Sequence, residues 1–70
     1  MDMHPVSSSN LTAAGFDPER QEIVIQFRSG GTYAYEGADE ALLQSLLSAS
    51  SPGRFFVDVI KDAYPARRIG

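Results

Sequence analysis

The spacing of apolar residues changes from two to 3.6 residues near the middle of this 70-residue chain. Over residues 21–28, Ile23, Ile25 and Phe27 alternate with more polar residues, as in a strand buried on one face. From residue 38 onward, the apolar residues recur at helical spacing. A chain of this length holds a single domain, so its helices must pack against its sheet. The helical stripe consists of Leu42, Leu43, Leu46 and Leu47.

Three strands are expected before this change of spacing. Residues 8–16 combine small, β-branched and apolar side chains and stop at Asp17-Pro18, a pair that begins a turn. Residues 21–28 and 32–36 flank Ser29-Gly30-Gly31, whose glycines suit the positive φ angles of a tight hairpin. The three strands are therefore expected to form an antiparallel β-meander.

Two helices are expected after the strands. Asp39 and Glu40 place negative charge where the first helix begins, which favours a helix of roughly three turns. Ser51 suits the N-cap and Pro52 the first position of the second helix, which Pro65 ends. The expected fold is α+β, with a three-stranded antiparallel meander followed by two α-helices on one sheet face. The buried face of the second helix is expected to comprise Phe56, Val59, Ile60 and Ala63.

Composition limits how such a domain is stabilised and where it acts. The chain has no cysteine, which excludes disulfides and thiolate metal sites and leaves packing to stabilise the fold. No stretch approaches the roughly 20 apolar residues of a membrane span, and the first residues lack the pattern of a signal peptide. We expect one cytoplasmic, bacterial-type domain over residues 1–70, with its core at about 6–65 and frayed ends. It is expected to be monomeric by default, to need no cofactor and to contact no membrane.

Charge is distributed unevenly along the chain. The net charge is −3, yet residues 1–50 carry seven acids and two bases, whereas residues 51–70 carry two acids and four bases. A net negative charge does not steer a protein toward a polyanion, although a local basic segment can still dock on one.

Tyr33-Ala34-Tyr35 lies at the centre of an ordered set of short motifs. The other members of the set are Ser8-Ser9-Asn10-Leu11, Gly15-Phe16-Asp17, Phe27, Ser29-Gly30, Ala49, Ser51, Gly53, Phe55-Phe56, Ile60-Lys61 and Tyr64. Over about residues 6–65 the set resembles the KTSC domain, a short module named for the C-terminus of some lysyl-tRNA synthetases. The chain departs from the family at Phe16, where Tyr is usual, and at Ser29, where Asn is usual. The resemblance implies the fold described above and, through the association with a synthetase, RNA binding.

The register of the central hairpin decides on which sheet face the two tyrosines lie. A two-residue loop at Ser29-Gly30 places Tyr33 and Tyr35 on the face away from the alternating apolar residues. A three-residue loop that includes Gly31 instead adds both rings to the core. Glycine at the second position suits a two-residue turn, so the sequence favours exposed tyrosines.

On an exposed face, Tyr33 and Tyr35 beside Arg28 would form an aromatic strip on which unpaired bases stack while the guanidinium meets a phosphate. Aromatic residues at this spacing also commonly pack within sheets, and the same strip suits a protein partner, including a second copy. The candidate auxiliary phosphate contacts are Arg54, Lys61, Arg67 and Arg68. These bases can equally serve to complement a helix dipole and to keep the tail soluble.

The remaining polar residues do not form a recognisable catalytic or metal site. His4 has no second histidine or cysteine near it, and Ser7-Ser8-Ser9 lacks the glycine context of a nucleophile. Asp39 and Glu40 are adjacent and so point to different sides of a helix, unlike a catalytic carboxylate pair. The sequence predicts a non-enzymatic module that binds RNA or another single-stranded nucleic acid, with protein–protein interaction as the alternative.

Overall fold

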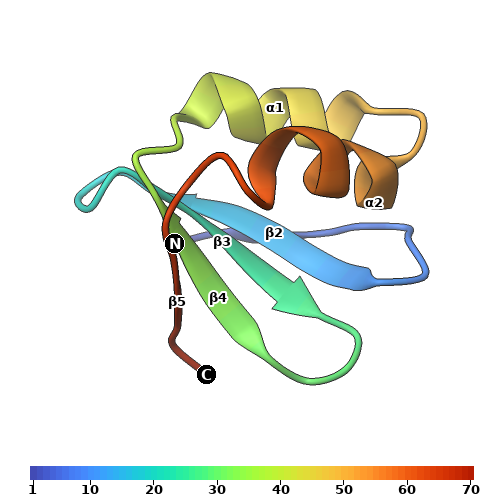
Figure 1. The fold of residues 1–70 in the computed structure, drawn as a ribbon, viewed down its shortest axis with the longest axis horizontal. Helices are drawn as coiled ribbons and strands as arrows, with labels where there is room; N and C mark the ends of the chain where they lie inside the picture. Colours follow the sequence, from blue (N-terminus) through green and yellow to red (C-terminus); the bar gives the residue numbers. More distant parts are fainter.

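The protein is a small α+β fold, described for residues 1–70 by a computed structural model. A five-stranded antiparallel sheet of order β1-β2-β3-β4-β5 carries the helices on one face (Figure 1). The strands are β1 (Met3–Pro5), β2 (Leu11–Asp17), β3 (Glu22–Phe27), β4 (Thr32–Glu36) and β5 (Ala66–Arg68). The helical segments are α1 (Glu40–Ser48), α2 (Pro52–Phe55) and the π-helical η1 (Phe56–Ile60). Neither helical region is long and apolar enough to cross a membrane.

The sheet has five strands rather than the three expected. The two additional strands are the chain ends, which were expected to fray. Strand β1 pairs with β2 through Met3↔Gly15, and β5 pairs with β4 through Tyr33↔Arg68. Each additional strand is three residues long, which is too short for an alternating pattern to be visible in the sequence.

Strand β2 begins later than expected, because residues 7–10 form a turn. The Ser8 hydroxyl accepts hydrogen bonds from the amides of Asn10 at 3.2 Å and Leu11 at 3.4 Å. A β-bulge then shifts the pairing between Leu11 and Ala13. The extra residue allows Leu11 and Ala14, three positions apart, both to be fully buried.

The hairpin between β3 and β4 has a three-residue loop, Arg28-Ser29-Gly30. The amide of Phe27 donates to the carbonyl of Gly31 at 2.8 Å, and Gly30 adopts a φ of 112°, which favours glycine. The resulting register places Tyr33 opposite Ile25 and Tyr35 opposite Ile23. Both tyrosines therefore lie on the helix-covered face, and the expectation of an exposed aromatic strip is wrong.

Helix α1 follows the sequence pattern closely. The Asp39 carboxylate caps its N-terminus by accepting from the amide of Leu42 at 2.9 Å. Leu43 and Leu46 are buried, while Leu42 and Leu47 are half-buried at the border of the core.

The second helical segment departs from a regular α-helix. Pro52 is its first residue as expected, but the amide of Lys61 donates to the carbonyl of Phe56, a bond that spans five residues. This wider turn keeps Phe56 and Ile60 buried but leaves Val59 39% exposed. The prediction that Val59 and Ala63 are buried is therefore wrong, and the helix ends at Ile60, before Pro65.

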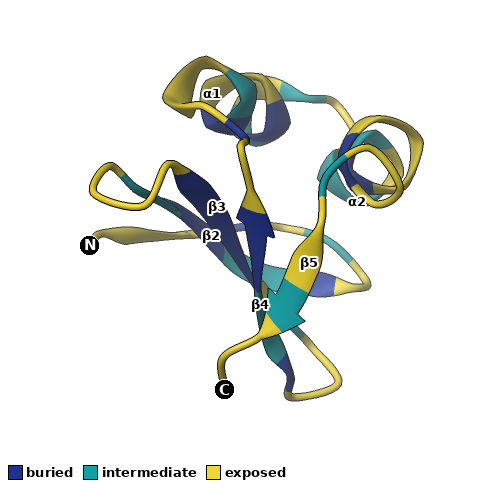
Figure 2. Ribbon diagram, turned by 60° about the vertical axis from the view of Figure 1, so that its left-hand side comes forward, coloured by how far each residue is buried: buried dark blue, intermediate teal, exposed yellow.

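The core lies between the sheet and the helices (Figure 2). The largest fully buried side chains come from β2, β3 and both helical regions, so each of these elements is held by the same cluster. They are Leu11, Ile23, Ile25, Leu43, Leu46 and Ile60. Packing of this cluster positions the β3–β4 hairpin below the second helical segment.

Candidate functional site

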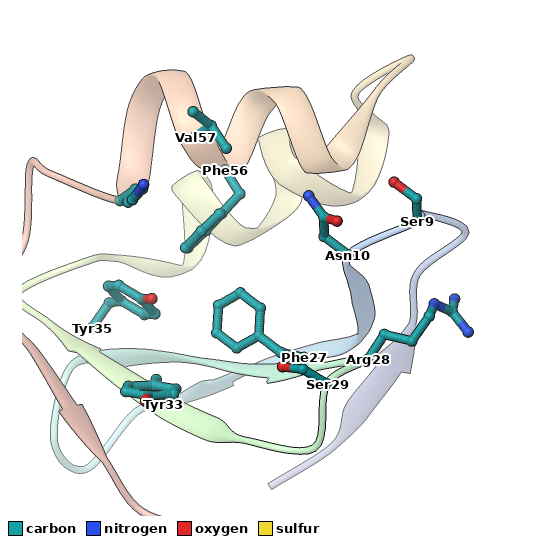
Figure 3. Close-up of a pocket in the computed structure, with 10 residues that line it drawn as sticks. Ser9, Asn10, Phe27, Arg28, Ser29, Tyr33, Tyr35, Phe56 and Val57 are labelled. Carbon is teal, nitrogen blue, oxygen red and sulfur yellow. The ribbon is translucent and has the colours of Figure 1, made fainter.

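A pocket of about 660 Å³ opens between the end of the β3–β4 hairpin and the second helical segment (Figure 3). Its walls come from the 7–10 turn, from β3, β4 and the loop between them, and from η1 and the residue that follows. The lining residues are Ser9, Asn10, Phe27, Arg28, Ser29, Tyr33, Tyr35, Phe56, Val57 and Lys61. A volume of this size lies within the range of pockets that bind small organic groups.

Four aromatic rings form one side of the pocket as a connected series. Phe27 contacts Tyr33 edge to face with ring centroids 5.7 Å apart, and it contacts Phe56 at 5.3 Å. Phe56 in turn contacts Tyr35 at 5.4 Å, again edge to face. Of the two tyrosines, Tyr35 is the more enclosed, because only 4% of its surface is exposed, whereas Tyr33 is half-buried. The series therefore offers rigid aromatic surface beside the opening, with Tyr33 as its accessible end.

Burial also changes the chemistry of the Tyr35 phenol. Desolvation raises the pKa of Tyr35 above its ordinary value, and the neighbouring Tyr33 adds to the increase. Tyr35 therefore remains a neutral wall of the pocket throughout the physiological pH range.

Two cations lie at the rim of the pocket. The Arg28 guanidinium donates to the carbonyl of Ser8 at 2.7 Å, and Figure 3 shows its side chain directed away from the rings toward the 7–10 turn. Lys61 directly follows η1. Neither side chain forms an ion pair, and no carboxylate lines the pocket. The rim is therefore positive even though the whole chain is acidic.

The fold thus brings Tyr33, Tyr35, Arg28 and Lys61 to one pocket, but not the other predicted site residues. Arg54 is exposed on α2 and pairs with Asp58 at 3.2 Å. Arg68 lies opposite Tyr33 on β5 and donates to the carbonyl of Gly70 at 2.9 Å, outside the pocket lining.

Arg67 lies on the sheet face that the helices do not cover. Its guanidinium forms a bidentate ion pair with Glu22 and lies 3.9 Å from a carboxylate oxygen of Glu36. Because β4 separates β5 from β3, the Arg67 stem must cross β4 to reach Glu22 on β3. On this face Ala34 of β4 and Val24 of β3 are both buried. The bond with Glu22 raises the pKa of Arg67, so the side chain stays charged and acts as a structural clasp.

Sequence reasoning missed several residues of the pocket. Phe27 and Phe56 were assigned to the core alone, although both also line the opening. Ser9 and Asn10 belong to a motif in the sequence but were not predicted to line a site. They lie in the turn that joins β1 to β2, and no sequence signal places this turn beside η1. No group of histidine, aspartate and glutamate side chains is arranged to hold a metal ion.

Comparison with known proteins gives a consistent result. The family model of the KTSC domain matches residues 7–64. A protein of Tsukamurella paurometabola is 39% identical over 64 residues, which cover 91% of this chain and 96% of that protein. An uncharacterized protein of Stutzerimonas stutzeri is 43% identical over 56 residues, covering 80% of this chain and 79% of that one.

A solved structure extends the similarity to the fold. The crystal structure of a KTSC domain protein from Yersinia pestis aligns with a TM-score of 0.91 at 46% identity, covering 99% of this chain and 97% of the other. The family match spans most of the residues that build both the core and the pocket. This chain therefore belongs to the KTSC domain family.

Proposed function

We propose that this protein is a small non-enzymatic module that binds single-stranded nucleic acid, with RNA as the first candidate. In this proposal one unpaired base enters the aromatic pocket and the adjoining phosphate meets the cationic rim. The observation that carries it is the combination of an aromatic wall with two cations, Arg28 and Lys61, that have no acidic partner.

Aromatic surface favours a flat ring as the bound group. Stacking of a base on an aromatic side chain contributes about 1–3 kcal/mol and tolerates any base, because every base has a π-face. Tyr33 is half-buried, so part of its ring remains accessible. The site differs from the open sheet platform expected from the sequence, because the rings line a pocket beneath η1.

The two cations at the pocket rim favour a ligand that carries an anionic group next to its flat ring. A phosphate can accept charge-assisted hydrogen bonds from Arg28, whose guanidinium has further donors beyond the one directed at Ser8. With only two cations at the rim and a net charge of −3, binding should be weak and sensitive to salt.

The test is fluorescence anisotropy of short labelled single-stranded RNA and DNA across a salt series. We expect the Arg28→Gln/Lys61→Gln variant to weaken binding about tenfold and to lower the slope of log affinity against log salt by about two. The control is Arg20→Gln, which removes one positive charge from an exposed turn at the opposite end of β3. Equal losses in both variants, or affinity that is independent of salt, would count against the proposal.

A second candidate function is protein docking, favoured by one observation. Val57 on the pocket rim is 45% exposed, so it extends the accessible apolar surface of the aromatic pocket. A partner chain would contact the same pocket and this valine, with Tyr33 and Arg28 as the residue types that are enriched in interface hot spots. Such binding should be nearly independent of salt, and self-association would appear as a concentration-dependent mass in sedimentation.

A further inference from the structure

A second hollow of about 640 Å³ adjoins the aromatic pocket. The two share Ser9, Asn10 and Val57 as lining residues, so they lie next to each other at these side chains. The second hollow lies between the 7–10 turn and residues 50–54, at the start of the second helical segment.

The second hollow is lined mainly by polar side chains, whereas the first has an aromatic wall. Val57 is its one hydrophobic lining residue, and most of the remainder is polar, with five serine hydroxyls and one ion pair, Arg54 with Asp58. Ser51 occupies the N-cap position of α2, yet its side chain makes no capping hydrogen bond. A hydroxyl that makes no capping hydrogen bond can instead bond to a ligand. The lining hydroxyls with no hydrogen-bond partner in the protein are those of Ser7, Ser9, Ser50 and Ser51.

The two walls of this hollow are fixed against each other. A Cβ atom placed on Gly53 would lie 2.8 Å from the Ser8 hydroxyl oxygen, so the walls approach as closely as glycine permits. The same hydroxyl accepts from the amides of Asn10 and Leu11, which holds its orientation. The free hydroxyls are thus displayed from a preformed frame, which lowers the entropic cost of binding.

The geometry points to a second subsite, in which this hydroxyl-lined hollow binds the sugar and phosphate next to the nucleotide whose base occupies the aromatic pocket. The inference rests on the proposed function and adds a minimum ligand, a dinucleotide unit. Sugar hydroxyls and phosphate oxygens both hydrogen-bond with serine, whereas a base has little apolar surface to contact there. Arg54 also lines the hollow, and because its pair with Asp58 is exposed and contributes little, the guanidinium can also donate to a phosphate, although the Asp58 carboxylate lies beside it.

The experiment compares adenosine 5′-monophosphate with the 5′-phosphorylated dinucleotide pApA by ¹⁵N-resolved NMR titration of the full chain. We expect the dinucleotide to bind about tenfold more tightly, since two net hydrogen bonds suffice for such a gain. It should also shift the amides of Ser9, Asn10, Ser50 and Gly53, which the mononucleotide should leave largely unchanged. Deoxyribose versions of both ligands separate recognition of the 2′-hydroxyl from recognition of phosphate oxygens.

The key variant is Ser50→Ala/Ser51→Ala, with Ser45→Ala/Ser48→Ala on the exposed side of α1 as the matched control. We expect the first variant alone to remove the dinucleotide advantage without changing affinity for the mononucleotide. A dinucleotide that binds no more tightly than the mononucleotide, or an unaffected first variant, would overturn the second subsite while leaving the proposed function intact. If neither ligand shifts the amides around Phe27 and Tyr33, the proposed function and this inference fail together.

Discussion

Individual residues determine what the pocket can bind. Tyr33 and Tyr35 were identified from the sequence as candidate site residues, but their sheet face was predicted wrongly. The parity of the register depends on one residue of loop length, and the positive φ that marks the loop lies at Gly30, its third residue. Local sequence preferences for turns are too small to decide between a register that exposes the two rings and one that buries them. Packing of the rings against Phe27 and Phe56 favours the buried placement.

The enclosed Tyr35 predicts a late step in alkaline titration. Its pKa is raised by burial, so above about pH 10 the unfolded chain loses this proton more readily than the folded protein does. The contribution of Tyr35 to stability is therefore complete below that pH and is lost as the pH rises toward the folded pKa. Ultraviolet titration should show a late phenol ionisation, and Tyr35→Phe should remove it. A late step that is missing from the wild-type curve, or that persists in Tyr35→Phe, would contradict the enclosed placement.

The clasp between Arg67 and Glu22 predicts a loss of stability when it is broken. Glu22 is buried but Arg67 is partly exposed, so we expect Glu22→Gln to cost about 1–2 kcal/mol of unfolding free energy, less than a fully buried pair. The matched control is Glu36→Gln, whose carboxylate is exposed and lies farther from the same guanidinium. Urea denaturation measures both variants, and equal effects would show that the clasp adds nothing specific.

At the scale of elements, the sequence predicts the central part of the fold well. Strands β3 and β4 and helix α1 follow their hydrophobic spacing, and Asp39 caps α1. The end strands β1 and β5 were not predicted, because backbone pairing with a neighbour defines them rather than any pattern of side chains. The pocket combines the β3–β4 hairpin, a turn and η1, and no local signal indicates that these segments meet.

The π-helical turn predicts opposite responses at two neighbouring positions. A regular α-helix would bury Val59 and Ile60 together, whereas the wider turn exposes Val59 and encloses Ile60. We expect Ile60→Val to cost about 0.5–1.5 kcal/mol through the cavity it leaves, and Val59→Thr to change stability by less than about 0.5 kcal/mol. Denaturant midpoints at unchanged m-value provide the measurement. A larger loss at Val59 than at Ile60 would indicate a regular helix.

At the scale of the whole molecule, size and charge set the limits on function. The domain measures 27 × 24 × 23 Å, so a single copy can contact only a few nucleotides. Its net charge of −3 opposes a nucleic acid at long range, and the favourable cations are Arg28 and Lys61 at the pocket rim and Arg54 in the adjoining hollow. Strong binding would therefore require several copies or attachment to a second binding module, which raises the effective concentration.

The central claim is that a base enters the pocket beneath η1, and intermolecular NOEs test it most directly. The sample is the protein with labelled aromatic side chains, mixed with short single-stranded RNA at low salt. We predict NOEs from base protons to the ring protons of Phe27 and Tyr33. The contradicting result is a spectrum in which base protons contact only the opposite sheet face around Arg67, or show no contact with the protein.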